Sequence, residues 1–179
     1  MTKNACLIVV DYQNDFVDGA LGFEGAEAIG KTIRDKIRAY HEAGQTVLFT
    51  MDTHDDAYLE SEEGKNLPVE HCIKGTKGHE LHPSIKDEKT SQDLVFEKNT
   101  FPSLELGNYL KSTHYETIEL VGLVSSICVL SNAIIAKSAL PNARIIVDAK
   151  GTAGPDRALH EKTLDVMENL HIHITNRSD

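Results

Sequence analysis

Three reactive side chains in this sequence each follow a short apolar run. Asp11 and Lys98 come directly after such runs, and Cys128 follows the run 117–123 across two serines. If the runs are parallel strands, the three side chains emerge at one edge of the sheet, where α/β proteins bind ligands. A cysteine nucleophile needs a base to take its proton and a cation to hold the thiolate. The trio therefore predicts nucleophilic catalysis by Cys128, with Asp11 as base and Lys98 fixing the charge and orientation of that carboxylate.

Cys128 also stands just before an alanine-rich helical pattern, residues 131–140. Free N–H groups at a helix start favour a thiolate over a thiol, so this position predicts an ionised sulfur. A purely structural interpretation stays open at this point. It treats Cys128 as a small apolar core residue, Asp11 as a turn or cap residue and Lys98 as a surface residue.

A second group of side chains has the composition of a metal site. Asp52 and His54 are two residues apart at the end of the apolar run 46–50, and His71 lies across a polar loop. Mixed carboxylate and imidazole ligands suit zinc, iron or manganese, although the same residues could be solvated side chains of a loop. Three glutamates of that loop are further candidates: Glu60, Glu62 and Glu63.

The order of hydrophobic patterns predicts an α/β fold. Short β-rich runs alternate with helical stripes, which favours a mainly parallel sheet covered by helices on both faces, a three-layer sandwich. The polar stretch 55–92 has little periodicity, and a loop that long in a compact domain is usually functional. The expected strands are 6–10, 46–50, 94–97, 117–123, 144–147 and 171–175, and the expected helices are 25–43, 104–112, 131–140 and 157–169.

Composition limits the class of protein. The 179 residues fit a single domain, 1–179, and 40% hydrophobic with 26% charged residues is ordinary for a globular protein. The net charge of −10 argues against nucleic acid as a partner, and no apolar run is long enough for a membrane span. The start Met1-Thr2-Lys3 lacks a signal-peptide pattern, and three cysteines without a CxxC pair suit a reducing compartment. We therefore expect a cytoplasmic protein.

Five sequence motifs occur in the order and spacing of a known family. They are LIVVDYQNDF at 7–16, TMDTH at 50–54, HCIKGTKG at 71–78, KNTF at 98–101 and GLVSSICV at 122–129. With these motifs the chain resembles the isochorismatase-like cysteine hydrolases, and within them the nicotinamidases. The resemblance covers nearly the whole length and implies a Rossmann-like α/β sandwich.

The resemblance also implies a catalytic machinery. In the family the matching residues form a Cys-Lys-Asp triad, here Cys128, Lys98 and Asp11. The Leu123–Val124 position matches a cis peptide bond that precedes the nucleophile. It implies an oxyanion hole formed by the backbone N–H groups of Val124 and Cys128.

The resemblance to this family also implies which residues bind the substrate and the metal. Phe16 matches an aromatic residue that packs on the substrate ring, with an ordinary core phenylalanine as the alternative, and Phe101 is the second substrate-binding candidate. Zinc is the first expectation for the metal, with iron or manganese as alternatives. The implied ligands are Asp52, His54, His71 and Glu63, with Glu60 or Glu62 possible in place of Glu63.

The resulting functional prediction is amide hydrolysis through a thioester, with nicotinamide giving nicotinate and ammonia. Two positions depart from the family pattern: Ser126 replaces an aspartate found in many relatives, and the loop between His54 and His71 has no tryptophan. Alternatives are an amidase for another small amide or carbamoyl compound, an isochorismatase, and a catalytically silent scaffold. The expected partners are a small amide and further copies of the chain in a dimer or tetramer.

Overall fold

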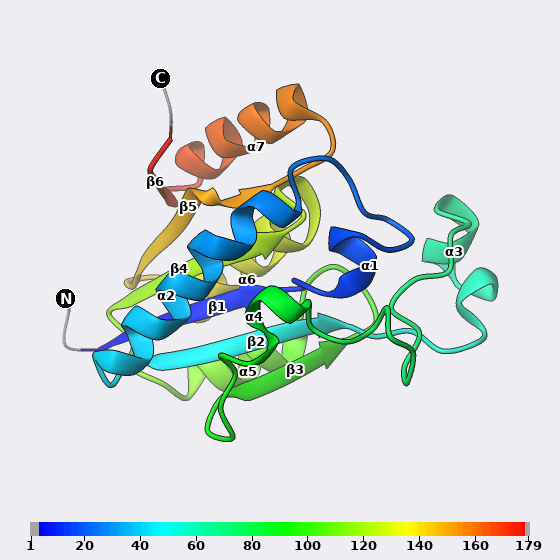
Figure 1. Cartoon of the computed structure of the whole chain (residues 1–179). Coiled ribbons are helices and arrows are strands. Elements are labelled where there is room, and N and C mark those ends of the chain that lie inside the picture. Colours follow the sequence, from blue (N-terminus) through cyan, green and yellow to red (C-terminus); the bar gives the residue numbers. More distant parts are fainter. Residues whose placement is uncertain (1–3, 178–179) are drawn as a thin grey trace.

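A parallel sheet of six strands organises the computed structural model, which describes residues 4–177 (Figure 1). The extreme ends of the expected domain 1–179, and the Met1–Lys3 start, lie outside the described residues. The strands run in the order β3-β2-β1-β4-β5-β6, and every neighbouring pair is parallel. Their bounds are β1 (Ala5–Val10), β2 (Thr46–Asp52), β3 (Leu94–Lys98), β4 (Thr117–Leu123), β5 (Arg144–Ala153) and β6 (His173–Thr175).

Helices connect these strands and cover both faces of the sheet (Figure 1). Within residues 4–177, no helix combines the length and apolar character needed to cross a membrane. The longer helices are α2 (Gly30–Glu42), α5 (Leu104–Lys111), α6 (Leu130–Ala139) and α7 (Arg157–Asn169), and the shorter ones are α1 (Asn14–Val17), α3 (Glu62–Asn66) and α4 (Pro83–Lys86). Single turns occur at η1 (Glu27–Ile29), η2 (Tyr58–Glu60) and η3 (Ser125–Val129), the last of π type.

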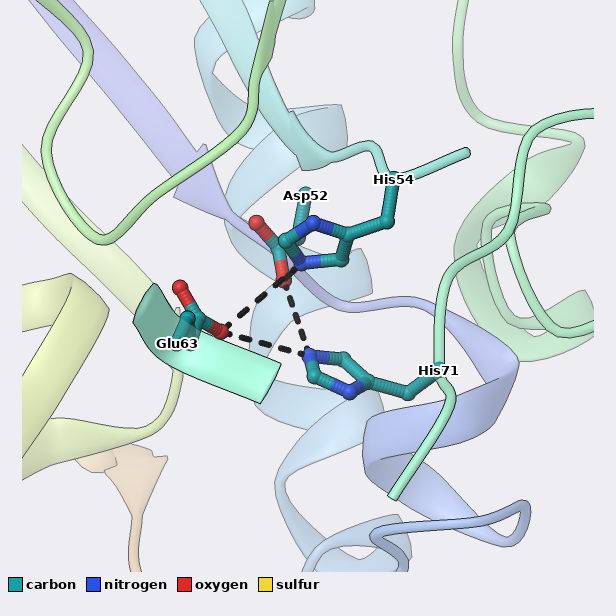
Figure 2. A group of neighbouring side chains, drawn as sticks. All are labelled: Asp52, His54, Glu63 and His71. Atoms are coloured by element: carbon teal, nitrogen blue, oxygen red, sulfur yellow. Dashed lines mark hydrogen bonds and ion pairs between the residues drawn. The ribbon is translucent and has the colours of Figure 1, made fainter. Parts of the chain in front are cut away.

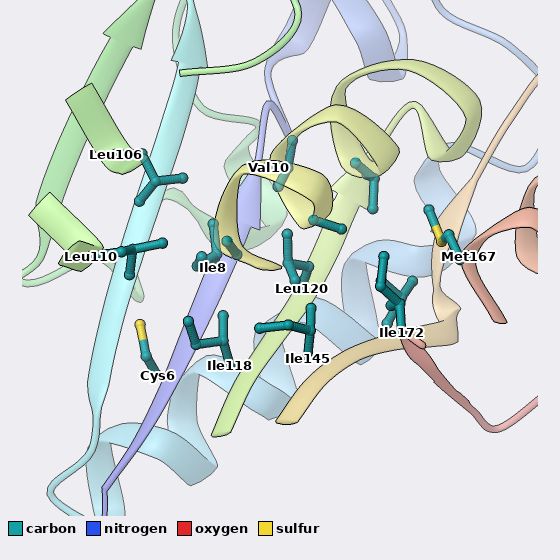
Figure 3. Packing of buried hydrophobic residues seen from close by; sticks show 14 of the residues in the cluster. Cys6, Ile8, Val10, Leu106, Leu110, Ile118, Leu120, Ile145, Met167 and Ile172 are labelled. Atoms are coloured by element: carbon teal, nitrogen blue, oxygen red, sulfur yellow. The ribbon is translucent and has the colours of Figure 1, made fainter. Parts of the chain in front are cut away.

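Strand β1 shows why the sheet is buried on both sides. All of its residues are buried, and successive side chains of a strand point to opposite faces. Cys6, Ile8 and Val10 pack in the cluster that residues of α5, α6 and α7 complete (Figure 3). Leu7 and Val9 pack in a second cluster with residues of α2. A continuous apolar run is therefore the expected sequence of this central strand.

The strand order reverses between β1 and β4. From β1 the chain builds outward through β2 to β3, and from β4 it builds outward in the other direction through β5 to β6. In open α/β sheets ligands bind outside the carboxyl ends of the strands at such a switch point. Asp11 follows β1 and Cys128 follows β4, so the two side chains flank this crevice.

A glycine allows β4 to approach β1 closely. Gly122 pairs with Val10 and has a φ of 121°, a conformation that residues with a side chain rarely adopt. A Cβ atom at Gly122 would lie 2.0 Å from the carbonyl oxygen of Val10. The residue type at this position therefore sets how close the end of β4 comes to the end of β1.

The predicted fold class is confirmed, and most elements begin and end within a few residues of the expected bounds. The strand 117–123 and the helix 157–169 have the predicted limits. Strand β5 continues past Asp148 to Ala153, because its pairing with β4 shifts register between Leu120 and Gly122. The stretch 55–92 contains α3 and α4, which are too short to give a periodic signal.

Replacing Gly122 with alanine should destabilise the protein strongly. Gly122→Ala combines the unfavourable φ with a backbone clash, so we expect the free energy of unfolding in urea to fall by more than ~3 kcal/mol. Gly44→Ala is the matched control, since its φ is also positive at 65° but a Cβ there meets nothing within 4 Å. It should cost only about 1 kcal/mol. Equal losses would show that β4 can move away from Val10 without penalty.

Candidate active site

Lys98 is the centre of the first cluster at the carboxyl edge of the sheet. Its Nζ lies 2.6 Å from Asp11 Oδ2, 3.3 Å from Asp52 Oδ1 and 3.8 Å from Cys128 Sγ. All four residues are buried. Burial disfavours the ammonium charge, but the neighbouring carboxylates outweigh it and raise the pKa of Lys98. The structure therefore brings together the three side chains that the sequence singled out, with Lys98 as a cation.

Asp11 is held in a defined orientation. It has no exposed surface, its φ is 46°, and Thr50 Oγ1 donates a 2.6 Å hydrogen bond to Oδ1. The other oxygen, Oδ2, forms the ion pair with Lys98 but no hydrogen bond of regular geometry. Burial raises the pKa of Asp11, and the opposing effect of Lys98 is smaller. The carboxylate is thus more basic than an ordinary aspartate and has an oxygen free to take a proton.

Cys128 carries a protonated sulfur at neutral pH. The residue is 5% exposed and lies inside η3, which continues directly into α6. Burial raises the pKa of the Cys128 thiol well above its usual range, the Asp11 charge raises it further, and Lys98 only partly opposes them. The expectation of a thiolate is therefore wrong. An argument from the helix start alone leaves out the loss of water and the adjacent carboxylate, which decide the outcome.

Four potential metal ligands form a second cluster beside the first (Figure 2). Asp52 Oδ2 lies 3.0 Å from His54 Nε2 and 3.3 Å from His71 Nε2. Glu63 Oε1 lies 3.8 Å and 3.7 Å from the same two nitrogens. One donor atom from each of the four residues falls within 4.8 Å of all the others. Asp52 ends β2 and Glu63 comes from α3, so the end of one strand and the loop that follows it, residues 52–71, supply all four donors.

The chemistry of these donors fits a divalent cation. His71 Nδ1 donates to the carbonyl of Val69 at 2.8 Å, which leaves the lone pair of neutral His71 on Nε2, facing the cluster. Glu63 Oε2 is buried without a hydrogen-bond partner among the described residues. Burial, reinforced by the charge of Asp52, raises the pKa of Glu63, as expected for a carboxylate whose compensating charge is not part of the protein. Glu60 and Glu62 are exposed and lie outside the group.

A mostly apolar cavity of about 270 Å³ connects the two clusters. Cys128, Asp52, Glu63 and His71 line it, whereas Asp11 and Lys98 are buried and are not among its lining residues. Phe16 and Phe101, the two expected substrate contacts, are both in its wall. The remaining lining residues are Leu21, Phe23, Leu67, Val124, Ser126, Ile127, Pro155, Asp156 and Leu159.

The two phenylalanines differ in their setting. Phe16 is 7% exposed, and its ring meets that of His71 edge-on at a centroid distance of 5.5 Å. Phe101 is 41% exposed and stands at the rim of the cavity. Val124 also lines the cavity, and the peptide bond that joins it to Leu123 is cis, as the family resemblance implied.

Sequence reasoning missed the residues that hold the clusters in place. Gln13 is fully buried, accepts a hydrogen bond from the backbone N–H of Asp52 and donates one to its carbonyl, both at 2.8 Å. The ring of Tyr58 packs on those of His54 and His71, with centroids 4.6 Å and 4.9 Å away. Gln13 had a signal in the sequence, because it lies two residues beyond Asp11 at the end of a buried strand. Tyr58 lies in the loop without periodicity and had none.

Comparison with known proteins identifies the family. The family model described as the isochorismatase domain matches residues 5–179, so this chain belongs to the isochorismatase family. A nicotinamidase of Acinetobacter baylyi is 30% identical over 178 residues, which cover 82% of this chain and 81% of the relative. The crystal structure of a pyrazinamidase/nicotinamidase from Streptococcus mutans superposes with a TM-score of 0.85 at 28% identity, covering 96% and 99% of the two chains. A pyrazinamidase of Pyrococcus horikoshii, solved in complex with zinc, shares the fold with a TM-score of 0.84 at 22% identity over 97% and 99%.

Removing the Asp11 charge should make the Cys128 sulfur easier to ionise. Because the negative charge of Asp11 raises the thiol pKa, Asp11→Asn should shift the pH profile of Cys128 alkylation by iodoacetamide to lower pH. The modified cysteine is assigned by peptide mass spectrometry. Asp148→Asn is the matched control, since Asp148 is also a buried carboxylate paired with a lysine, Lys36 at 2.7 Å. An unchanged or upward-shifted profile for Asp11→Asn would show that Asp11 does not act on the sulfur.

Proposed function

We propose that this chain is a cysteine amidohydrolase that converts nicotinamide and water to nicotinate and ammonia. The observation that carries the proposal is the convergence of Asp11, Lys98 and Cys128 behind one small cavity that also receives metal-type donors. The similarity to the nicotinamidase of Acinetobacter baylyi over most of both chains supports the same reaction. In this proposal Asp11, Lys98 and Cys128 are the catalytic residues.

The cavity favours a small, flat and neutral substrate. Its volume of about 270 Å³ lies just below the range that is usual for small-molecule sites, and its wall is mainly apolar and aromatic. No lysine or arginine is found among its lining residues in the described chain, so no ammonium or guanidinium group there would pair with an anionic substrate. A pyridine ring between Phe16 and Phe101 would place its amide at Cys128 and its ring nitrogen toward His71 and Asp52.

Acylation begins with proton transfer inside the buried cluster. Asp11 takes the thiol proton as the Cys128 sulfur attacks the amide carbonyl carbon, which suits a raised thiol pKa matched by a more basic carboxylate. Lys98 keeps the carboxylate in place and offsets the negative charge. The backbone N–H groups of Val124 and Cys128 are the proposed donors to the oxyanion. The tetrahedral intermediate expels the amine, which receives the proton from Asp11 and leaves as ammonia.

Deacylation uses the same carboxylate a second time. Asp11 takes a proton from water as the water oxygen attacks the thioester carbonyl, and the C–S bond then breaks. The proton returns to the sulfur, and nicotinate leaves the cavity. The sum of the two halves is amide plus water giving acid plus ammonia, so no further reactant is required.

The metal ligands in this proposal are Asp52, His54, His71 and Glu63. A divalent ion bound there, zinc in our proposal, would supply a Lewis acid that binds and orients the pyridine nitrogen. Because Asp52 also contacts Lys98, the same carboxylate would link the metal ligands to the catalytic residues. Glu63 is the glutamate that we assign to the site.

Ammonia release from nicotinamide tests the reaction and its nucleophile. The purified protein should hydrolyse nicotinamide and pyrazinamide, and Cys128→Ala should lower kcat by about 1000-fold or more, because the covalent intermediate can no longer form. Cys6→Ala and Cys72→Ala are the matched controls and should retain activity, since both thiols are buried and neither residue lines the cavity. Full turnover by Cys128→Ala would exclude the covalent mechanism. Hydrolysis of other small amides but not of nicotinamide would exclude nicotinamide as the substrate.

Metal content tests the assignment of Glu63. Glu63→Ala should weaken zinc affinity at least ~10-fold in a competition titration, because one of the donor atoms is lost. Glu62→Ala changes the neighbouring, exposed glutamate of the same helix and should leave the affinity unchanged. Equal affinities for the two variants would remove Glu63 from the ligand set.

A further inference from the structure

The turn η3 sets the position of both the nucleophile and the proposed oxyanion donors. It contains Cys128, and Val124 immediately precedes it. The turn is short, so its placement depends on contacts with the elements around it. Two polar side chains that the proposed reaction does not use, Asn132 of α6 and His160 of α7, make such contacts.

Asn132 connects η3 by hydrogen bonds to the segment that follows β3. Its Nδ2 donates to the carbonyl of Cys128 at 2.8 Å and to the carbonyl of Phe101 at 3.1 Å. Its Oδ1 accepts from the backbone N–H of Ser103 at 3.0 Å. Asn132 has no exposed surface, and both hydrogens of its amide group are engaged. One side chain therefore links the backbone of the nucleophile to the segment that carries the aromatic rim of the cavity.

His160, a residue of α7, forms a hydrogen bond with Ser125, the first residue of η3. Its Nδ1 lies 2.9 Å from Ser125 Oγ, and Ser125 is fully buried. The helix that carries His160 also supplies Leu159 to the cavity wall. Burial lowers the pKa of His160, so the ring is neutral at neutral pH and accepts or donates one hydrogen bond at each nitrogen.

We propose that Asn132 and His160 are positioning residues that fix Cys128 and Val124 between the two walls of the substrate cavity. The inference rests on the proposed amidohydrolase function, since it concerns the alignment of that nucleophile with a bound amide. A reacting atom displaced by about 1 Å can cost on the order of 100-fold in rate. Each residue connects η3 to a different wall: Asn132 to the side of Phe101, and His160 to the side of Leu159.

For His160 the test is to remove its hydrogen bond to Ser125 with one variant and to restore it with another. His160→Phe keeps the ring shape and removes the bond to Ser125, so kcat for nicotinamide should fall ~10- to 100-fold with KM little changed. His160→Asn places an amide near the position of Nδ1 and should restore most of kcat. In the double variant Ser125→Ala/His160→Phe the loss should be no larger than in either single variant, because both remove the same bond. Thr163→Val is the matched control: it removes a partly buried hydrogen bond within α7, from Thr163 Oγ1 to the carbonyl of Leu159, and should retain kcat.

For Asn132 the test separates the side-chain hydrogen bond to Cys128 from the hydrogen bonds to Phe101 and Ser103. Asn132→Ser keeps a hydroxyl that can donate to the carbonyl of Cys128 four residues earlier but cannot reach residues 101–103. It should therefore raise KM while kcat stays within about threefold. Asn132→Leu removes every bond and should lower kcat as well. If Asn132→Leu does not fold, Asn132→Ser still decides between positioning of the Phe101 segment and no role.

A measurement that needs no amide substrate separates this inference from the proposed function. The rate of Cys128 alkylation by iodoacetamide reports on the sulfur alone, and it should change in His160→Phe and Asn132→Leu. If the unmodified protein hydrolyses no amide while these alkylation rates still change, the proposed function fails and the positioning role survives. If kcat, KM and alkylation all stay unchanged while the melting temperature falls, the two residues only stabilise the fold and the inference is overturned.

Discussion

The buried ammonium group of Lys98 is the interaction on which the site depends. Removing a charge from water is costly, and a buried cation persists only where anions surround it closely. Here Asp11 and Asp52 supply those anions from the ends of β1 and β2, while Lys98 ends β3. Without the lysine, the buried carboxylate of Asp11 would have no ion-pair partner among the described residues. The neighbouring order β3-β2-β1 is what allows one ammonium group to reach both.

This arrangement of charges explains why the Cys128 sulfur is protonated when no substrate is bound. The positive charge of Lys98 favours a thiolate at Cys128, but burial and the negative charges of Asp11 and Asp52 oppose it and raise the pKa of the thiol. Burial then raises the pKa values of both Asp11 and the thiol. Proton transfer and nucleophilic attack are therefore best understood as one event, which limits the exposure of a reactive thiolate to water when no substrate is bound.

Part of the site could be predicted because it lies at strand ends, which apolar runs mark clearly. Asp11, Lys98 and Cys128 converge once those runs are known to be parallel strands, and the intervening helices indicate that they are. Glu63 could not be separated from Glu60 in η2 and Glu62 in α3, because these two short elements give no periodic signal that shows which glutamate faces the histidines. The ionisation of Cys128 was mispredicted, since burial and a neighbour distant in sequence determine it. Residues such as Asn132 and His160 gave no local pattern, because their partners are known only from the fold.

The site lies at the contact between two halves of the chain. The first half, through β3, supplies the base, the lysine and the four metal-type donors, and the second half supplies the nucleophile. The halves pair along β1 and β4, and Gly122, which has no side chain, allows the close contact with Val10 at the end of this pairing. Asn132 crosses the same boundary, since it belongs to the second half and bonds to Phe101 and Ser103 in the segment after β3. A fold assembled around a switch point brings the reactive groups near one another, and side chains that cross the boundary must then set their distance.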